Sequence, residues 1–170
     1  SYMAACLNAR YGLWTNGTDR YCFAKRDRGK GKFEFEEIVE ISAVGESEED
    51  AQKPKRKDLK PATADNLLYA FRRCHNYIAG SEGMQKPEAF WELLKLIFCK
   101  IEDERSSELS FYVTPSELKS KTSAHSTKAR IQKLFTSKVV KDYPAIFAAS
   151  DAQVIQLNPS VVAFVVGQLQ

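Results

Sequence analysis

The 170-residue sequence has few of the residues that build metal centres and nucleophilic active sites. It contains two histidines and four cysteines, and no cysteine pair has the spacing of a zinc site. His75 and His125 lie far apart in the sequence, without neighbouring partners for a catalytic pair, so we interpret His75 as structural and His125 as exposed. We therefore expect no catalytic residue, no metal and no cofactor within this chain.

Long apolar runs are also missing. No stretch has the roughly 20 consecutive apolar residues of a membrane-spanning helix, and the first residues do not resemble a signal peptide. We expect no membrane partner and a reduced, cytoplasmic protein. A hydrophobic content of 44% allows a packed core, whereas a net charge of +3 says little about any partner.

The first 45 residues read as a small antiparallel sheet. Strands are predicted at Arg10–Thr15, at Arg20–Ala24 and at Lys32–Ile41, with a charged loop over Lys25–Lys32. Between the first two strands lies Asn16-Gly17, a strong signal for a tight hairpin turn. We interpret residues 1–45 as a partial β-hairpin region.

Residues 46–62 change in character, because a run of acids is followed by a run of bases and two prolines. Such a composition is typical of a solvated linker. Residues 63–170 then carry helix signals. We accordingly predict an α+β, mostly helical fold, in which the small sheet is followed by a helical bundle of about four or five helices.

Start and stop signals place these helices. Thr63 or Asp65 caps a first helix that ends near Gly80 and Gly83. Pro87 opens a second helix that runs to about Arg105. The remaining signals are a capping box at Thr114-Pro115-Ser116-Glu117, an amphipathic stretch over Ser126–Lys141, and Asn158-Pro159 before the last helix.

The helix that opens at Pro87 is apolar on almost every side, and Glu88, Glu92, Lys95 and Glu102 form a narrow polar edge. A core helix explains this pattern, and so does a helix with one face docked on a partner subunit, a further domain or a second copy of the chain. The predicted interface residues are Trp91, Leu94, Phe98, Val162 and Val166.

Basic residues concentrate between Lys119 and Lys141, and Arg130, Lys133, Ser137 and Lys141 share the helix face opposite the apolar stripe. Such a face can follow DNA phosphates, and an ordinary solvated face is the alternative. The candidate phosphate contacts, as positioning residues rather than base readers, are Arg72, Arg73, Lys128, Arg130, Lys133 and Lys141. Glu117-Leu118-Lys119 matches a nuclease-like Glu-x-Lys step, but a helix cap explains Glu117 better.

Several stretches resemble one protein family. Phe71-Arg72-Arg73-Cys74-His75-Asn76-Tyr77-Ile78 and Phe98-Cys99-Lys100-Ile101-Glu102-Asp103-Glu104 are similar to the helical segment that precedes the catalytic domain of type I restriction-modification N-6 adenine DNA methyltransferases. Similar stretches continue the match at Lys57–Pro61, Phe111–Pro115, Asp142–Phe147 and Val161–Gln170. Ala9–Gly17 resembles the closing part of the nuclease-like N-terminal domain of type I restriction R proteins.

This resemblance implies a non-catalytic, prokaryotic N-terminal module that positions DNA and assembles subunits or domains. The family's methyltransferase domain holds a glycine-rich S-adenosylmethionine loop and an Asn-Pro-Pro-aromatic step, and neither occurs here. S-adenosylmethionine and site-specific adenine-N6 methylation are therefore expected of a parent protein. The chain ends read as incomplete helices, so we interpret it as a piece of a longer protein. The alternative is a fragment of a type I restriction R-like protein, a nuclease relic.

Overall fold

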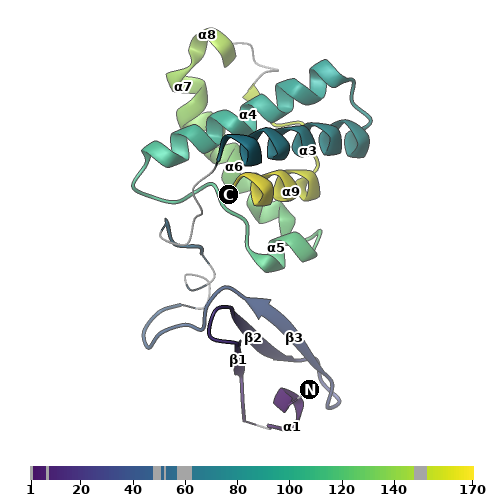
Figure 1. Ribbon diagram of the computed structural model, residues 1–170, viewed down its shortest axis with the longest axis vertical. Helices are drawn as coiled ribbons and strands as arrows, with labels where there is room; N and C mark the ends of the chain where they lie inside the picture. Colours follow the sequence, from purple (N-terminus) through teal and green to yellow (C-terminus); the bar gives the residue numbers. More distant parts are fainter. Residues whose placement is uncertain (1, 7, 48–50, 52, 57–62, 148–152) are drawn as a thin grey trace. The chain divides into compact units, whose positions relative to one another are not determined.

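The computed structural model describes residues 2–6, 8–47, 51, 53–56, 63–147 and 153–170 (Figure 1). They form two compact units. The β unit comprises residues 1–54 with 114–116, and the helical unit comprises residues 55–113 and 117–170. The predicted fold class is confirmed, since a small antiparallel sheet precedes a mostly helical region.

The β unit begins with a short helix, α1 (Tyr2–Ala5), and continues into three antiparallel strands in the order β1-β2-β3. Their bounds are β1 Tyr11–Thr15, β2 Arg20–Asp27 and β3 Phe33–Ile38. The Asn16 side chain closes the predicted hairpin turn, because its Oδ1 accepts hydrogen bonds from the backbone N–H of Thr18 and Asp19. Gly17 supplies the positive φ of 92° that the turn requires.

The predicted loop over Lys25–Lys32 begins too early, because β2 continues through Asp27. Cross-strand ion pairs explain the extension. Arg26 Nε lies 3.2 Å from Glu36 Oε2, and Arg28 Nη2 lies 2.5 Å from Glu34 Oε2. Opposite charges on paired strands stabilise the ladder, so charged residues here belong to the sheet.

The helical unit follows the predicted caps closely. α3 (Ala64–Glu82) ends at Gly83, whose φ is 65°. α4 (Lys86–Arg105) starts with a capping box between Gln85 and Glu88, with proline in its first turn. The remaining elements are α5 Pro115–Lys119, α6 Ala124–Leu134, η2 Phe135–Val139, α7 Val140–Asp142, α8 Pro144–Phe147 and α9 Pro159–Leu169. Among the described helices none is sufficiently long and apolar to cross a bilayer.

The predicted helix over Ser126–Lys141 is not one regular helix. α6 starts two residues earlier, at Ala124, and passes into one turn of π-helix, η2, before α7. The π-turn keeps the buried stripe continuous, because Phe135 and Val139 within it and Ile131 and Leu134 before it are all buried. The apolar stripe was therefore predicted correctly, but its geometry was not.

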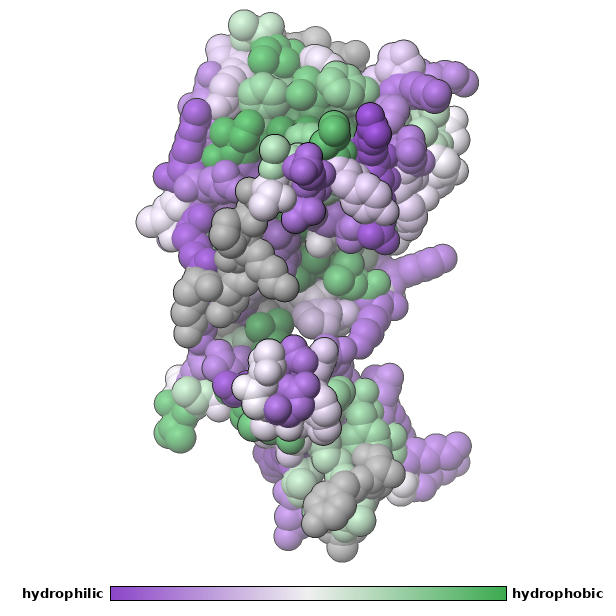
Figure 2. All heavy atoms as spheres, viewed as in Figure 1, coloured by the Kyte–Doolittle hydropathy of each residue, from purple (hydrophilic) through white to green (hydrophobic). Residues whose placement is uncertain are grey.

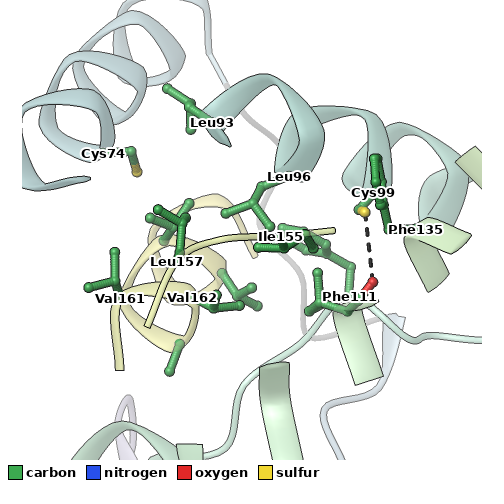
Figure 3. Packing of buried hydrophobic residues seen from close by; sticks show 14 of the residues in the cluster. Cys74, Leu93, Leu96, Cys99, Phe111, Phe135, Ile155, Leu157, Val161 and Val162 are labelled. Carbon is green, nitrogen blue, oxygen red and sulfur yellow. Dashed lines mark hydrogen bonds between the residues drawn. The ribbon is translucent and has the colours of Figure 1, made fainter. Parts of the chain in front are cut away.

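One apolar core holds the helical unit together. Figure 3 shows Leu96 of α4 pointing toward Leu157, and Leu93, Ile155, Val161 and Val162 belong to the same buried cluster. α9 packs against both α3 and α6, and α4 packs against α3 and the π-turn. The single apolar stripe of each helix thus closes on the others, which is how a bundle of this size excludes water.

The predicted linker, residues 46–62, lies partly outside the described residues, which omit 48–50, 52 and 57–62. Its described part contains an anchored residue. Arg56 Nη2 donates hydrogen bonds to the carbonyl oxygens of Asp103 and Ser106, the latter at 2.5 Å, and to that of Glu108 at 3.3 Å. A guanidinium over the last carbonyls of α4 satisfies groups that a helix end leaves unpaired.

Candidate functional site

α6 and α7 carry three lysines that make no hydrogen bond or ion pair with any described residue. Lys133 and Lys141 are exposed and Lys128 is half-buried. The inner side of the same segment is packed, with Ala124, Thr127 and Ile131 buried. We call Lys128, Lys133 and Lys141 the lysine face. Its ammonium groups are free to neutralise a polyanion such as nucleic acid.

Arg130 was predicted to belong with these lysines, but its guanidinium is occupied. Nη1 and Nη2 donate to the Glu117 carboxylate at 3.0–3.2 Å, and Nη2 also donates to the Tyr112 carbonyl at 2.8 Å. The guanidinium carbon lies 3.7 Å from the centre of the Tyr112 ring. With its side chain only 22% exposed, Arg130 serves as an internal tie and we exclude it from the lysine face.

Arg72 and Arg73 lie on α3 and are exposed. The Arg73 guanidinium sits 5.5 Å from the centre of the Phe164 ring, and Tyr77 stacks on the same ring at 3.8 Å. α9, which carries Phe164, packs against both α3 and α6. The two predicted arginines and the lysine face therefore occupy different helices, and no described contact brings them together.

A cleft of about 590 Å³ opens beside the first half of α4. Its lining residues are Met84, Pro87, Glu88, Trp91, Glu92, Lys95 and Gln156. The Trp91 ring forms one wall of the cleft and is 37% exposed. The cleft was not predicted, because it depends on contacts between α4 and residues 154–156, which lie 59 to 64 positions further along the chain.

The wall of the cleft contains a buried ion pair. Lys95 Nζ donates to Glu92 Oε1 at 2.5 Å and to the Val154 carbonyl at 2.7 Å. Glu92 Oε2 accepts the Gln156 backbone N–H at 2.9 Å. Both charges are thereby compensated, as burial demands, and the pair ties α4 to residues 154–156. This corrects the prediction of a polar edge, since Glu92, Lys95 and Glu102 are buried rather than solvated.

The predicted interface residues divide into surface and core positions. Trp91 reaches the surface, whereas Leu94 and Phe98 are half-buried. The Phe98 ring packs edge-on against Tyr143 at 4.6 Å and Phe147 at 5.4 Å. Val162 and Val166 are fully buried in the core of the helical unit, so neither faces a partner in this conformation. Of this predicted set, Trp91 is the residue that a partner can reach most fully.

Figure 2 shows where apolar side chains gather on the visible face, over the region of α4, α7 and α8 in the upper part of the view. Exposed apolar residues of these helices include Trp91 and Ile146. Hydrophilic side chains border this surface in the same view. An apolar surface with a polar rim is typical of a protein-binding site.

A polar cluster that the sequence did not reveal joins the end of α4 to Tyr143. The Tyr143 hydroxyl donates to Glu102 Oε1 at 2.8 Å, and Arg105 Nη1 donates to both groups. The hydrogen bond to Glu102, helped by desolvation, raises the pKa of Tyr143 above its ordinary value. All three groups are mutually paired, so the cluster fixes Tyr143 at the end of α4.

Metal-binding geometry is not found among the described residues, where no three His, Cys, Asp or Glu side chains converge. His75 has the structural role that was predicted, since its Nε2 lies 2.9 Å from the Lys86 carbonyl oxygen. No family model, curated protein or solved structure matches this chain. The lysine face and the cleft beside α4 are therefore the two features of the described residues that bear on function.

Proposed function

We propose that the chain is a non-catalytic N-terminal module of a type I-like restriction-modification DNA (adenine-N6) methyltransferase, and that it positions the enzyme on DNA and assists assembly of its domains or subunits. The observation that carries the DNA-positioning role is the lysine face. Its ammonium groups lack described partners, while the opposite side of the same helix is buried. The family assignment within the proposal is supported by the resemblance of residues 71–78 and 98–104.

The chemistry of the lysine face fits positioning rather than base recognition. Lysine ammonium groups contact phosphates as point charges, and α6 offers no exposed set of arginine, asparagine and glutamine for base edges. Binding by such a face is independent of sequence and weakens steeply as counterions compete. In the parent enzyme, target selection and the methyl donor S-adenosylmethionine then belong to other domains or subunits.

Salt-dependent binding to duplex DNA tests this role. Lys133→Gln removes one phosphate contact, so the slope of log K against log salt should become shallower by about 0.9. Lys141→Gln should act alike, and Lys86→Gln is the matched control, because Lys86 is an exposed lysine on α4 outside the lysine face. Duplex binding that is insensitive to salt, or equally reduced by Lys86→Gln, would contradict the proposal.

A second role, docking of a partner subunit or a second copy, is favoured by the exposed wall of Trp91 in the apolar cleft. Aromatic residues of this kind dominate binding energy at interfaces. Light scattering on the isolated chain tests self-association, with Trp91→Ala expected to shift any dimer to monomer. Phe90→Ala is the matched control, because Phe90 is the neighbouring exposed aromatic and does not line the cleft. A monomer at all concentrations would leave assembly to a different partner chain.

The nuclease-relic alternative gains no specific support from a described residue. Incubation of supercoiled plasmid with the chain and Mg²⁺ tests it directly, since any metal-dependent nuclease activity would appear as nicked or linear product.

A further inference from the structure

A short helix, a connection of four residues and a longer helix follow one another in the helical unit. α5 ends at Lys119, α6 begins at Ala124, and residues 120–123 connect them (Figure 1). This order of elements is that of a helix-turn-helix, in which the second helix enters the major groove of DNA. α6 has 11 residues and is therefore about 16 Å long, which is sufficient to lie along such a groove.

Side-chain contacts hold α5 against its neighbours. The Glu117 carboxylate of α5 accepts hydrogen bonds from both terminal nitrogens of Arg130 on α6, at 3.0–3.2 Å. Leu118 of α5 approaches α9, because a Cβ added at Gly167 would lie 3.4 Å from the Leu118 side chain. α6 packs against the same helix, α9. The end of α5 and the start of α6 therefore share one support.

The outer side of α6, a helix described in full, is exposed and carries no large apolar side chain. It is formed by His125, Ser126, Ala129 and Lys133, whose spacings of one, three and four residues place them on one side of the helix. The opposite side is buried in the core of the helical unit. A helix that lies in a membrane surface needs an apolar outer face, so an acidic lipid surface fits this side poorly.

Positive charge dominates the segment that carries this outer side. Residues 118–141 contain seven lysines and arginines and no aspartate or glutamate. Arg130 is paired with Glu117, whereas Lys121, Lys128 and Lys133 make no hydrogen bond or ion pair with a described residue. Lys121 precedes the first turn of α6 and Lys133 follows it, so unpaired ammonium groups lie before and after the exposed turn. Such a distribution suits a ligand with phosphates on either side of a groove.

We propose that α6 enters the major groove of B-form duplex DNA, with His125, Ser126 and Ala129 toward the base edges and the unpaired lysines at the phosphates. This inference rests on the proposed DNA-positioning role and names the helix and the groove that serve it. The major groove, about 12 Å wide, admits an α-helix, whereas the minor groove, about 6 Å wide, does not. Duplex RNA fits poorly, because its major groove is too narrow for side chains to read. None of the three residues offers a bidentate amide or guanidinium, so no base sequence is strongly selected.

Fluorescence anisotropy of the whole chain with short labelled duplexes tests the choice of groove. Substituents at cytosine C5 lie in the major groove, so duplexes with glucosylated hydroxymethylcytosine should bind about tenfold or more weakly. Netropsin, which occupies the minor groove, should change the affinity by less than about twofold. Duplex RNA of the same sequence should bind about tenfold or more weakly than duplex DNA.

Ser126→Trp tests whether α6 is the helix that enters the groove. A bulky side chain on the exposed first turn of α6 keeps this helix away from the base edges, so duplex affinity should fall by about tenfold or more. Ser81→Trp is the matched control, because Ser81 is an exposed serine in the last turn of α3. It should bind duplex DNA as the parent does, and circular dichroism should show both variants folded.

The results separate this inference from the proposed function. Salt-dependent duplex binding that weakens in Lys133→Gln, but is insensitive to glucosylation and to Ser126→Trp, would overturn the groove assignment and leave the positioning role intact. Equal affinity for DNA and RNA duplexes, or equal losses for Ser126→Trp and Ser81→Trp, would also overturn it. No duplex binding at low salt would overturn both proposals. Tighter binding to phosphatidylserine vesicles than to duplex DNA would assign the outer side of α6 to a membrane instead.

Discussion

Replacement of Arg130 by methionine is the most informative perturbation of the helical unit, because it separates an internal tie from a DNA contact. Methionine keeps much of the side-chain length and removes the charge. The Glu117 carboxylate, 9% exposed, would then lose its bidentate partner. Breaking a buried ion pair from one side costs about 3–5 kcal/mol. Since Arg130 is 22% exposed, we take the lower end, about 3 kcal/mol of unfolding free energy.

For the helical unit of residues 55–113 and 117–170, 1 kcal/mol shifts the melting temperature by about 4 °C, so Arg130→Met should lower Tm by roughly 12 °C. Urea unfolding followed by circular dichroism measures the free energy, and a thermal scan measures Tm. Lys133→Met is the matched control on the same helix. Its side chain is exposed without a described partner, so the change should stay within about 0.5 kcal/mol.

A double-mutant cycle with Glu117→Gln sharpens the test. If the two side chains act as one pair, the double variant should lose less stability than the sum of the single variants. The reasoning would be refuted by an Arg130→Met protein of parental stability whose duplex binding falls as in Lys133→Gln. In that case Arg130 would join the lysine face after all.

Three further predictions concern the ion pair, the helix ends and the thiols. Lys95→Met leaves Glu92 buried and unpaired, so urea unfolding should show a loss of about 3–5 kcal/mol, and the Glu92→Met/Lys95→Met double variant should lose less. Gly83→Ala should lower the free energy of unfolding by about 1–2 kcal/mol, because φ is 65° there, whereas Gly80→Ala inside α3 should raise it by up to about 1 kcal/mol. If urea unfolding showed both substitutions to change stability in the same direction, Gly83 would not be the left-handed end of α3. Burial raises the pKa of the Cys74 thiol to about 11, so at pH 8 its reactive thiolate is scarcer than in an ordinary cysteine. Exposed Cys6 should therefore react with iodoacetamide first, as mass spectrometry of native protein would show, and a native Cys74 that reacts as fast would contradict its burial.

Local signals in the sequence were sufficient for element boundaries at several places. Pro87, the Asn158-Pro159 pair and the glycine after Glu82 lie where the helices begin and end. These signals work because they satisfy backbone groups within a few residues of themselves. The three strands were likewise found from alternation and the turn at Asn16.

Long-range partners account for what the sequence did not reveal. Lys95 was predicted to lie on a polar edge of its helix. The Val154 carbonyl that accepts its hydrogen bond, and the Gln156 N–H that donates to its partner Glu92, both lie about 60 residues away in the sequence. Arg130 looked like a phosphate contact for the same reason, since Glu117 and Tyr112 reach it from the preceding segment. The helical pattern of a charged side chain predicts which face it lies on but not its partner, so Arg130 was predicted as a phosphate contact although its guanidinium is already paired.

The aromatic residues of the sheet show a different gap. Each aromatic residue was visible in the predicted strands, but their common side depends on the register between strands, which the sequence did not specify. The pairing of Trp14 with Tyr21 places both on the face opposite Cys22 and Ala24. Which of these rings share a face could therefore be known only from the structure.

The π-turn between Phe135 and Val139 has a consequence for how this chain compares with its relatives through evolution. Such a turn absorbs one more residue than a regular helical turn and leaves both flanks in phase. A homologue with one residue fewer at this place would keep Ile131 and Tyr143 on their present sides while losing only the local widening. Alignments of more distant sequences should accordingly allow a one-residue gap within 135–139, whereas a gap elsewhere in this helix would rotate everything downstream by about 100°.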